Sequence, residues 1–135
     1  MKTKEIQRRL NEIYSLVPNF NCDRCGQCCG PIHWGLSEDI IIREFLKENK
    51  REYIKWNEDD YINNELRCPY YNREKNICTI YQVRPLICRL QGVVKELPCP
   101  NKIPNKILPR QTTDEMWRIF RKLEKELDDE KNNGM

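Results

Sequence analysis

The chain has 135 residues, of which 39% are hydrophobic and 33% are charged, and its mean hydropathy is -0.85. A chain of this length and polarity fits one domain, 1–135, with a modest apolar core that gains from a staple such as bound metal. The net charge of +3 is too small to indicate a nucleic-acid or membrane partner.

The first segment, residues 1–18, has the pattern of an amphipathic helix that ends at Pro18. Its apolar residues fall on one face of a helical period: Ile6, Leu10, Ile13, Tyr14 and Val17. The charged start is not followed by an apolar stretch, so a secretory signal is not indicated, and no run is long enough to span a membrane. We therefore expect a cytoplasmic protein with no membrane partner.

An irregular loop is expected from Asn19 to Gly35, because glycine and proline interrupt any regular pattern there. It carries the densest group of cysteines in the chain: Cys22, Cys25, Cys28 and Cys29. The thiols of Cys22, Cys25 and Cys28 are spaced to reach one centre, and soft thiolates suit zinc or an iron–sulfur cluster. Adjacent side chains in extended backbone point to opposite sides, so Cys29 is expected to serve a second centre or to stand free.

The next helix is predicted to begin with Ser37 as its N-cap and to run to about Lys50. Glu38 and Asp39 then lie in the first turn, where acidic side chains suit the helix dipole. The predicted buried positions of this helix are Ile40, Ile41, Phe45 and Leu46. Residues 51–64 are predicted to form a short helix and a connector.

A small β-hairpin is predicted where Tyr70-Tyr71 and the segment 77–80 flank the polar turn 72–76. Pro85 leaves room for a short turn of helix after it. Four prolines between residues 98 and 110 indicate an extended segment over the surface.

The last helix, 112–130, is marked by a capping-box pattern from Thr112 to Glu115, and fraying is expected from Asp128 onward. Its predicted apolar face comprises Met116, Ile119, Phe120, Leu123 and Leu127. The fold class is therefore mainly α, with irregular cysteine-rich loops and a small β-hairpin, in a single metal-stapled domain.

The remaining cysteines recur at nearly even intervals: Cys68, Cys78, Cys88 and Cys99. The eight thiols would fill two four-ligand sites, although the sequence does not require two. Reduced cytosolic thiols favour metal ligation over disulfides, but the abundant Lys, Glu, Ile and Asn leave open a thermophile, in which intracellular disulfides occur.

Three motifs together resemble the YkgJ-type cysteine-cluster family, also called the CxxCxxCC zinc- or iron-chelating domain. They are the run at 22–29, the segment Cys68-Pro69-Tyr70-Tyr71, and the block from Cys78 to Arg89 that reads Cys-x-Ile-Tyr-x-x-Arg-Pro-x-x-Cys-Arg. A helix start at Leu36-Ser37-Glu38-Asp39 also matches. The resemblance covers about residues 20–100, which form the expected metal-binding module between the flanking helices 1–18 and 112–130.

The resemblance implies that the cysteines bind zinc, iron or an iron–sulfur cluster. The excess of thiols and the adjacent cysteines favour a cluster, expected to be [4Fe–4S], and leave zinc open as the alternative. The resemblance also favours Arg84 and Arg89 as residues beside the metal centre, where guanidinium groups would offset the charge of the thiolates. His33, the one histidine of the chain, is more often a hydrogen-bonded surface residue than a ligand in such a position.

The predicted function is a cytosolic metal-binding protein with a role in redox chemistry or metal handling, and a protein partner is possible. The alternative is an iron–sulfur oxidoreductase or a methyltransferase-like enzyme that modifies proteins, since family relatives include both kinds. A third reading, a zinc-ribbon module for nucleic acid or protein, is disfavoured because the spacings lack paired Cys-x2-Cys knuckles.

Overall fold

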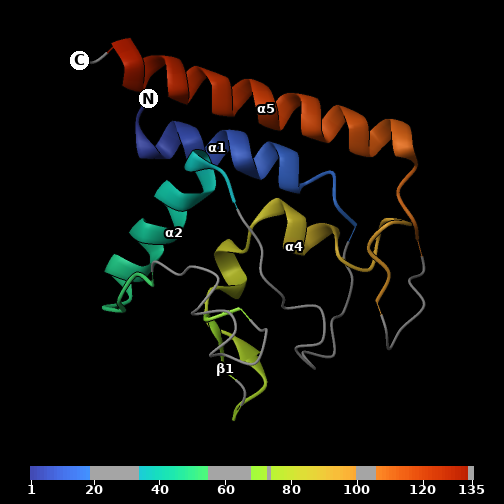
Figure 1. The fold of residues 1–135 in the computed structure, drawn as a ribbon, viewed down its shortest axis with the longest axis horizontal. Helices are drawn as coiled ribbons and strands as arrows, with labels where there is room; N and C mark the ends of the chain where they lie inside the picture. The colour runs from blue at the N-terminus through green and yellow to red at the C-terminus, as the bar shows by residue number, and fades with distance from the viewer. Residues whose placement is uncertain (19–33, 55–67, 73, 100–105, 134–135) are drawn as a thin grey trace.

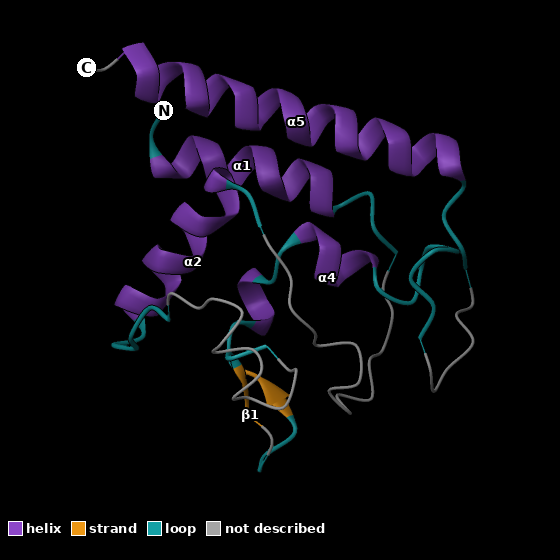
Figure 2. Cartoon of the chain, viewed as in Figure 1, coloured by secondary structure: helices purple, strands orange, loops and turns teal. Residues whose placement is uncertain are grey.

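The computed structural model describes residues 1–18, 34–54, 68–72, 74–99 and 106–133 of the chain. Within these ranges the helices are α1 (Thr3–Tyr14), α2 (Leu36–Glu48), the 3-10 turn η1 (Tyr81–Val83), α4 (Leu86–Leu90) and α5 (Arg110–Asn133). The strands β1 (Tyr71–Asn72) and β2 (Ile77–Cys78) form a two-stranded antiparallel sheet. The prediction of a mainly helical fold with a small hairpin is therefore confirmed (Figures 1 and 2). The metal staple and the single-domain boundary stay predictions.

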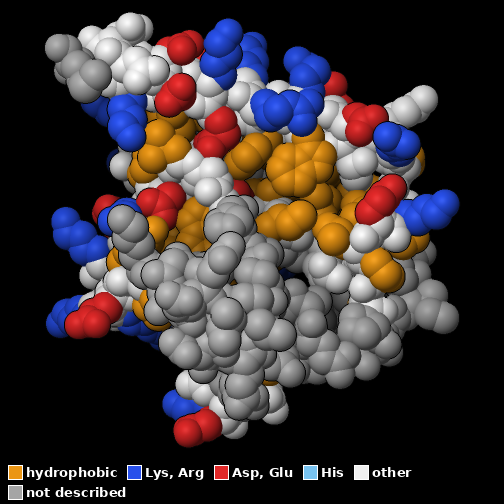
Figure 3. Space-filling view, in the orientation of Figure 1, with side chains coloured by type: hydrophobic (Ala, Val, Ile, Leu, Met, Phe, Trp, Pro, Cys, Tyr) orange, Lys and Arg blue, Asp and Glu red, His pale blue; other side chains and the backbone are white. Residues whose placement is uncertain are grey.

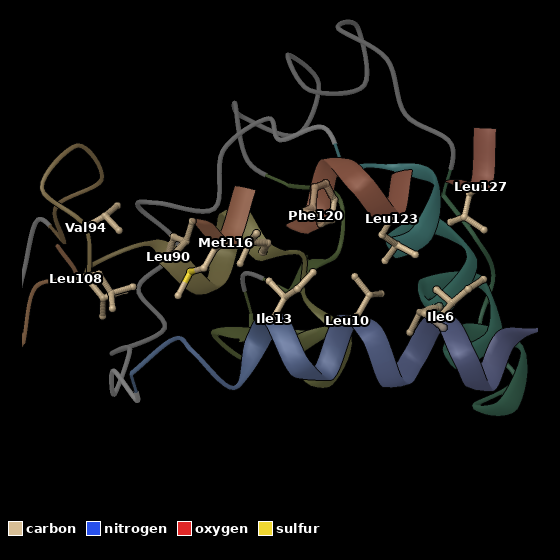
Figure 4. Close-up of a cluster of buried hydrophobic side chains, with 13 residues drawn as sticks. Ile6, Leu10, Ile13, Leu90, Val94, Leu108, Met116, Phe120, Leu123 and Leu127 are labelled. Carbon is tan, nitrogen blue, oxygen red and sulfur yellow. The ribbon is translucent and has the colours of Figure 1, made fainter. Parts of the chain in front are cut away.

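The two flanking helices lie along the same side of the molecule, where α1 runs beneath α5 in the opposite direction (Figure 1). The predicted apolar face of α1 is confirmed, since Ile6, Leu10 and Ile13 are all buried. These side chains point from α1 toward the apolar face of α5 (Figure 4). On α5 the buried residues are Met116, Phe120, Leu123 and Leu127, and Ile119 is partly buried against them.

A second and smaller core lies around α2 and the hairpin. It contains five buried residues: Ile42, Leu46, Cys68, Tyr70 and Ile80. Of the predicted stripe of α2, Ile41 and Leu46 are buried, whereas Ile40 and Phe45 are only partly buried. The fully buried Ile42 was missed, because α2 faces two cores and not one.

Two predicted helix starts are wrong. Gly35 and not Ser37 is the N-cap of α2, and the hydroxyl of Ser37 is buried without a hydrogen-bond partner among the described residues. The first turn is capped from another helix, because the Glu124 carboxylate accepts the Ser37 N–H at 2.9 Å. A Cβ on Gly35 would overlap that carboxylate, so a larger residue there would displace the Glu124 side chain from this position. The tertiary partner therefore replaces the local cap.

The last helix begins at Arg110, before the predicted capping box at Thr112, and it continues to Asn133, so the expected fraying from Asp128 is also wrong. Pro109 precedes the first turn, and its carbonyl accepts the N–H groups of Thr112 and Thr113 at 3.0 and 3.2 Å. Proline is well suited to a helix start because its ring fixes φ and it lacks an N–H to satisfy.

The predicted short helix after Pro85 is confirmed as α4, and Pro85 is its N-cap. In the proline-rich segment, residues 106–109 have no regular structure, as predicted, and the Leu108 N–H donates to the Val93 carbonyl at 2.8 Å. The predicted helix and connector at 51–64 lies outside the described residues, except for 51–54, which are not helical.

None of the described helices combines the length and the apolar character that crossing a membrane requires. On the face shown in Figure 3, side chains of both charge signs gather along α5, and hydrophobic side chains gather next to them.

The C-terminus of α2 is closed by a residue in the left-handed conformation, Lys50, with φ of 55°. The Arg51 N–H donates to the Leu46 carbonyl at 2.8 Å, and the Lys50 N–H donates to the Lys47 carbonyl at 3.1 Å. This is the Schellman arrangement, in which the left-handed position is usually glycine.

Replacing Lys50 with glycine should raise the free energy of unfolding by about 1 kcal/mol, because a Cβ in the left-handed region is strained. Lys47→Gly is the matched control, since Lys47 is another exposed lysine but lies inside α2. It should lower the free energy of unfolding by about 1 kcal/mol. Urea unfolding followed by circular dichroism measures both, and equal effects of the two substitutions would contradict the assignment.

Candidate metal centre

Cys68 begins a tight turn that is built around its own sulfur. The Tyr71 N–H donates to the Cys68 carbonyl at 3.0 Å, and the backbone N–H groups of Tyr70 and Tyr71 hydrogen-bond to the Cys68 thiol. The side chain is only 6% exposed. Burial raises the pKa of Cys68 to about 11, while the two N–H groups act in the opposite direction. Such N–H donors stabilise a thiolate, which is the form that binds metal.

The hairpin places Cys78 beside this turn. Tyr71 pairs with Cys78 across the antiparallel sheet, and the Thr79 N–H donates to the Tyr70 carbonyl at 2.8 Å. The charge of Cys78 is felt at Cys68, where it raises the pKa further. Two of the predicted ligands are therefore neighbours because of strand register, which is a property of the whole hairpin.

Cys88 joins the same neighbourhood from α4. Burial raises the pKa of its thiol most, and the charges of Cys68 and Cys78 raise it further, followed by that of Glu38. The guanidinium of Arg84 acts in the opposite direction on the Cys88 pKa. Cys68, Cys78 and Cys88 follow one another at intervals of ten residues in the sequence. They thus lie within electrostatic range of one another in the fold.

In the part of the chain that it describes, the structure does not place the other predicted ligands beside these three cysteines. Cys22, Cys25, Cys28 and Cys29 lie outside the described residues, as does His33. Cys99 is half-buried beyond α4 and is not among the groups that act most strongly on Cys88. Within the described ranges no three His, Cys, Asp or Glu side chains converge closely enough to hold a metal ion.

The two predicted arginines have different surroundings. Arg84 lies over the Tyr81 ring at 3.9 Å and donates to the Tyr81 carbonyl at 2.9 Å. Arg89 lies over the Tyr14 ring at 3.8 Å and donates to the carbonyls of Arg84 and Gln82 at 2.8 and 3.2 Å. Burial lowers the pKa of Arg89. Arg89 therefore connects α4 to the turn that precedes it and to α1. A direct role of either arginine at a metal stays a prediction.

Arg89→Lys keeps the positive charge but loses the planar fork that reaches two carbonyls at once. We expect it to lower the free energy of unfolding by about 1 kcal/mol, because a lysine ammonium does not reach both carbonyls and the part-buried Arg84 carbonyl or the exposed Gln82 carbonyl loses its donor. Thermal unfolding monitored by circular dichroism measures the loss. A variant as stable as the unchanged protein would show that only the charge of Arg89 matters.

A buried carboxylate next to the cysteines was not foreseen as a functional residue. Glu38 is 3% exposed, and its Oε2 accepts both the Leu86 N–H and the Tyr14 hydroxyl at 2.6 Å. Burial raises the pKa of Glu38, which these two donors partly oppose. The sequence indicated only a favourable interaction of Glu38 with the helix dipole. Glu38 also falls within the matched Leu-Ser-x-Asp helix start, but at its variable position.

Asp39, the next residue, holds a second group of side chains. Its Oδ1 accepts the Trp34 indole N–H at 3.0 Å and the Tyr53 hydroxyl at 2.7 Å. The Trp34 ring also lies 6.1 Å from the ring of Tyr70, centroid to centroid. The described chain therefore resumes at Trp34 beside the turn that begins with Cys68.

The comparison with protein families agrees with this geometry. The family model CxxCxxCC, described as "Putative zinc- or iron-chelating domain", matches residues 21–124. This range contains the cysteine run, the hairpin, α4 and the first half of α5. The chain belongs to this family, as its motifs indicated, and the family description supports metal binding.

A curated relative is the uncharacterized protein MJ0661 of Methanocaldococcus jannaschii, which is 31% identical over 100 residues. The match covers 67% of this chain and 52% of the relative, so the chain spans about half the length of that protein. No solved structure matches the chain.

Proposed function

We propose that this chain is a metal-binding protein in which cysteine thiolates hold an iron–sulfur cluster. The observation that carries this function is the gathering of Cys68, Cys78 and Cys88 from the turn, the hairpin and α4. Two of these thiols lie in settings that penalise an isolated thiolate, because burial and like charges raise the pKa values of Cys68 and Cys88.

The donor set fits a thiophilic metal. Buried thiolates that repel one another are stabilised when a cation binds between them, and the N–H donors at Cys68 already favour its ionised form. Sulfur ligands select zinc, iron–sulfur clusters and copper(I) over magnesium or calcium. When bound, an iron–sulfur cluster would supply one-electron chemistry.

Further ligands are needed, because the described residues alone do not converge on a metal. The run at Cys22–Cys29 is the natural source. Cys28 and Cys29 precede Trp34 by six and five residues, so chain geometry keeps them within about 20 Å of it. Trp34 in turn lies against Tyr70, two residues from Cys68. Cys22, Cys25, Cys28 and Cys29 are proposed as these further ligands because of their spacing in the sequence, and they lie outside the described residues.

The number of thiols fits more than one centre, since one zinc ion and one [4Fe–4S] cluster each take four ligands and the chain has eight cysteines. Anaerobic purification followed by metal analysis and visible absorbance distinguishes the two. Iron with acid-labile sulfide and a brown colour would support the cluster, whereas a colourless protein loaded with zinc would replace it with a zinc site.

Cys88→Ser should lose most of the bound metal, because a serine hydroxyl does not replace a soft thiolate ligand. Metal content per chain measured by mass spectrometry gives the result. Cys99→Ser is the informative companion, since it tests whether the more distant Cys99 is a ligand as its place in the sequence suggests. Full metal content in Cys88→Ser would contradict the assignment.

Removal of the metal should destabilise the region from the Cys68 turn to α4, because metal and folding are coupled when the ligands come from several elements. We expect the melting temperature measured by calorimetry to fall sharply after chelation under reducing conditions, and to recover on reconstitution. An unchanged melting temperature would show that metal binding and folding are not coupled.

The biological task that this centre serves is proposed to be redox chemistry or metal handling in the cytoplasm, with a protein partner as recipient. The enzyme alternatives, an oxidoreductase or a methyltransferase-like protein, stay predictions. Binding of S-adenosylmethionine to the purified chain, measured by calorimetry, would favour the methyltransferase.

A further inference from the structure

The Glu38 carboxylate, which comes from α2, contacts both the first helix of the chain and the element that carries Cys88. Its Oε2 accepts the Tyr14 hydroxyl from the end of α1 and the Leu86 N–H from the first residue of α4. Cys88 follows Leu86 by two residues. We propose that Glu38 is a positioning residue, which holds the α4 turn so that Cys88 faces Cys68 and Cys78.

The local chain alone does not hold this turn firmly. α4 has five residues, too few for a helix to be stable by itself in water. At its start, the N–H groups of Cys88 and Arg89 donate to the Pro85 carbonyl at 3.0 and 3.1 Å. The position of Cys88 therefore depends on contacts from outside α4.

Glu38 supplies one such contact, at the N-terminal residue of α4. A second connection is made by Arg89 of α4, which donates to the carbonyls of Gln82 and Arg84 in the segment before the helix. Both reach the same ring, since Tyr14 donates to Glu38 and lies under Arg89. A buried backbone N–H that loses its acceptor costs free energy, and without Glu38 the Leu86 N–H would have no acceptor at this place.

The charge of Glu38 does not explain its presence at this site. It acts against the thiolates, because it raises the pKa of Cys88. An acceptor oxygen in the right place, and not a negative charge, is what the turn uses. This distinction makes the role testable, because glutamine offers the oxygen without the charge.

Glu38→Ala should weaken metal affinity by about tenfold to a hundredfold, the range found when residues that orient metal ligands are removed. Glu38→Gln should restore an affinity close to that of the unchanged protein. Competition with a chromogenic chelator, using zinc as the probe metal, measures all variants. An affinity of Glu38→Ala equal to that of the unchanged protein, or a loss in Glu38→Gln as large as in Glu38→Ala, would overturn the positioning role.

Glu124→Ala is the matched control. Glu124 is also a carboxylate that accepts the N–H of a residue in the first turn of a helix, but its partner is Ser37 of α2 and not the α4 turn. It should lower the melting temperature and leave zinc affinity unchanged. An equal loss of affinity in Glu124→Ala and Glu38→Ala would show a general effect of stability and would overturn the specific role of Glu38.

When it is measured through metal affinity, the positioning role of Glu38 rests on the proposed function. A second measurement, which needs no metal, therefore separates the failure of this role from the failure of the proposed function. If the unchanged protein binds no metal, the proposed function fails, and alkylation of the reduced chain by iodoacetamide tests Glu38 alone. Glu38→Ala should speed the labelling of Cys88 relative to Cys99, as followed by mass spectrometry of peptides. An unchanged ratio would overturn the role of Glu38 independently of any metal.

Discussion

The Glu38 carboxylate joins three parts of the chain that are far apart in sequence: the end of α1, the first turn of α2 and the start of α4. A buried carboxylate is costly unless it is hydrogen-bonded, so its two donors are as necessary to it as it is to them. Since α4 is too short to be stable by itself, the arrangement of the cysteine region depends on this junction.

The structure shows what the residues between the cysteines of the family motif do in the fold. In the block from Cys78 to Arg89, Ile80 is buried in the second core, Pro85 precedes α4, and Arg89 binds the carbonyls of the turn. These residues shape the backbone between two cysteines and do not themselves need to touch a metal. The motif therefore specifies a rigid loop for thiols, which explains why it contains more than cysteine.

The fold has two hydrophobic cores that connect different elements. The larger one joins α1, α4 and α5 through apolar side chains, and the smaller one joins α2 to the hairpin and includes Cys68. The cysteine neighbourhood lies where the smaller core meets α4. Burial raises the pKa values of two of its thiols, those of Cys68 and Cys88.

The sequence by itself determined the helical faces of α1 and α5, the hairpin, the short helix after Pro85 and the family. These features follow from periodicity, turn residues and motif spacing, which are local. The start of α5 at Arg110 depends on Pro109 next to it, whose signal competed with the capping-box pattern at Thr112. Only the tertiary structure decided the capping of α2 by Glu124 and the burial of Glu38. Both depend on partners that are distant in sequence, and no local pattern encodes which backbone N–H their carboxylates will reach.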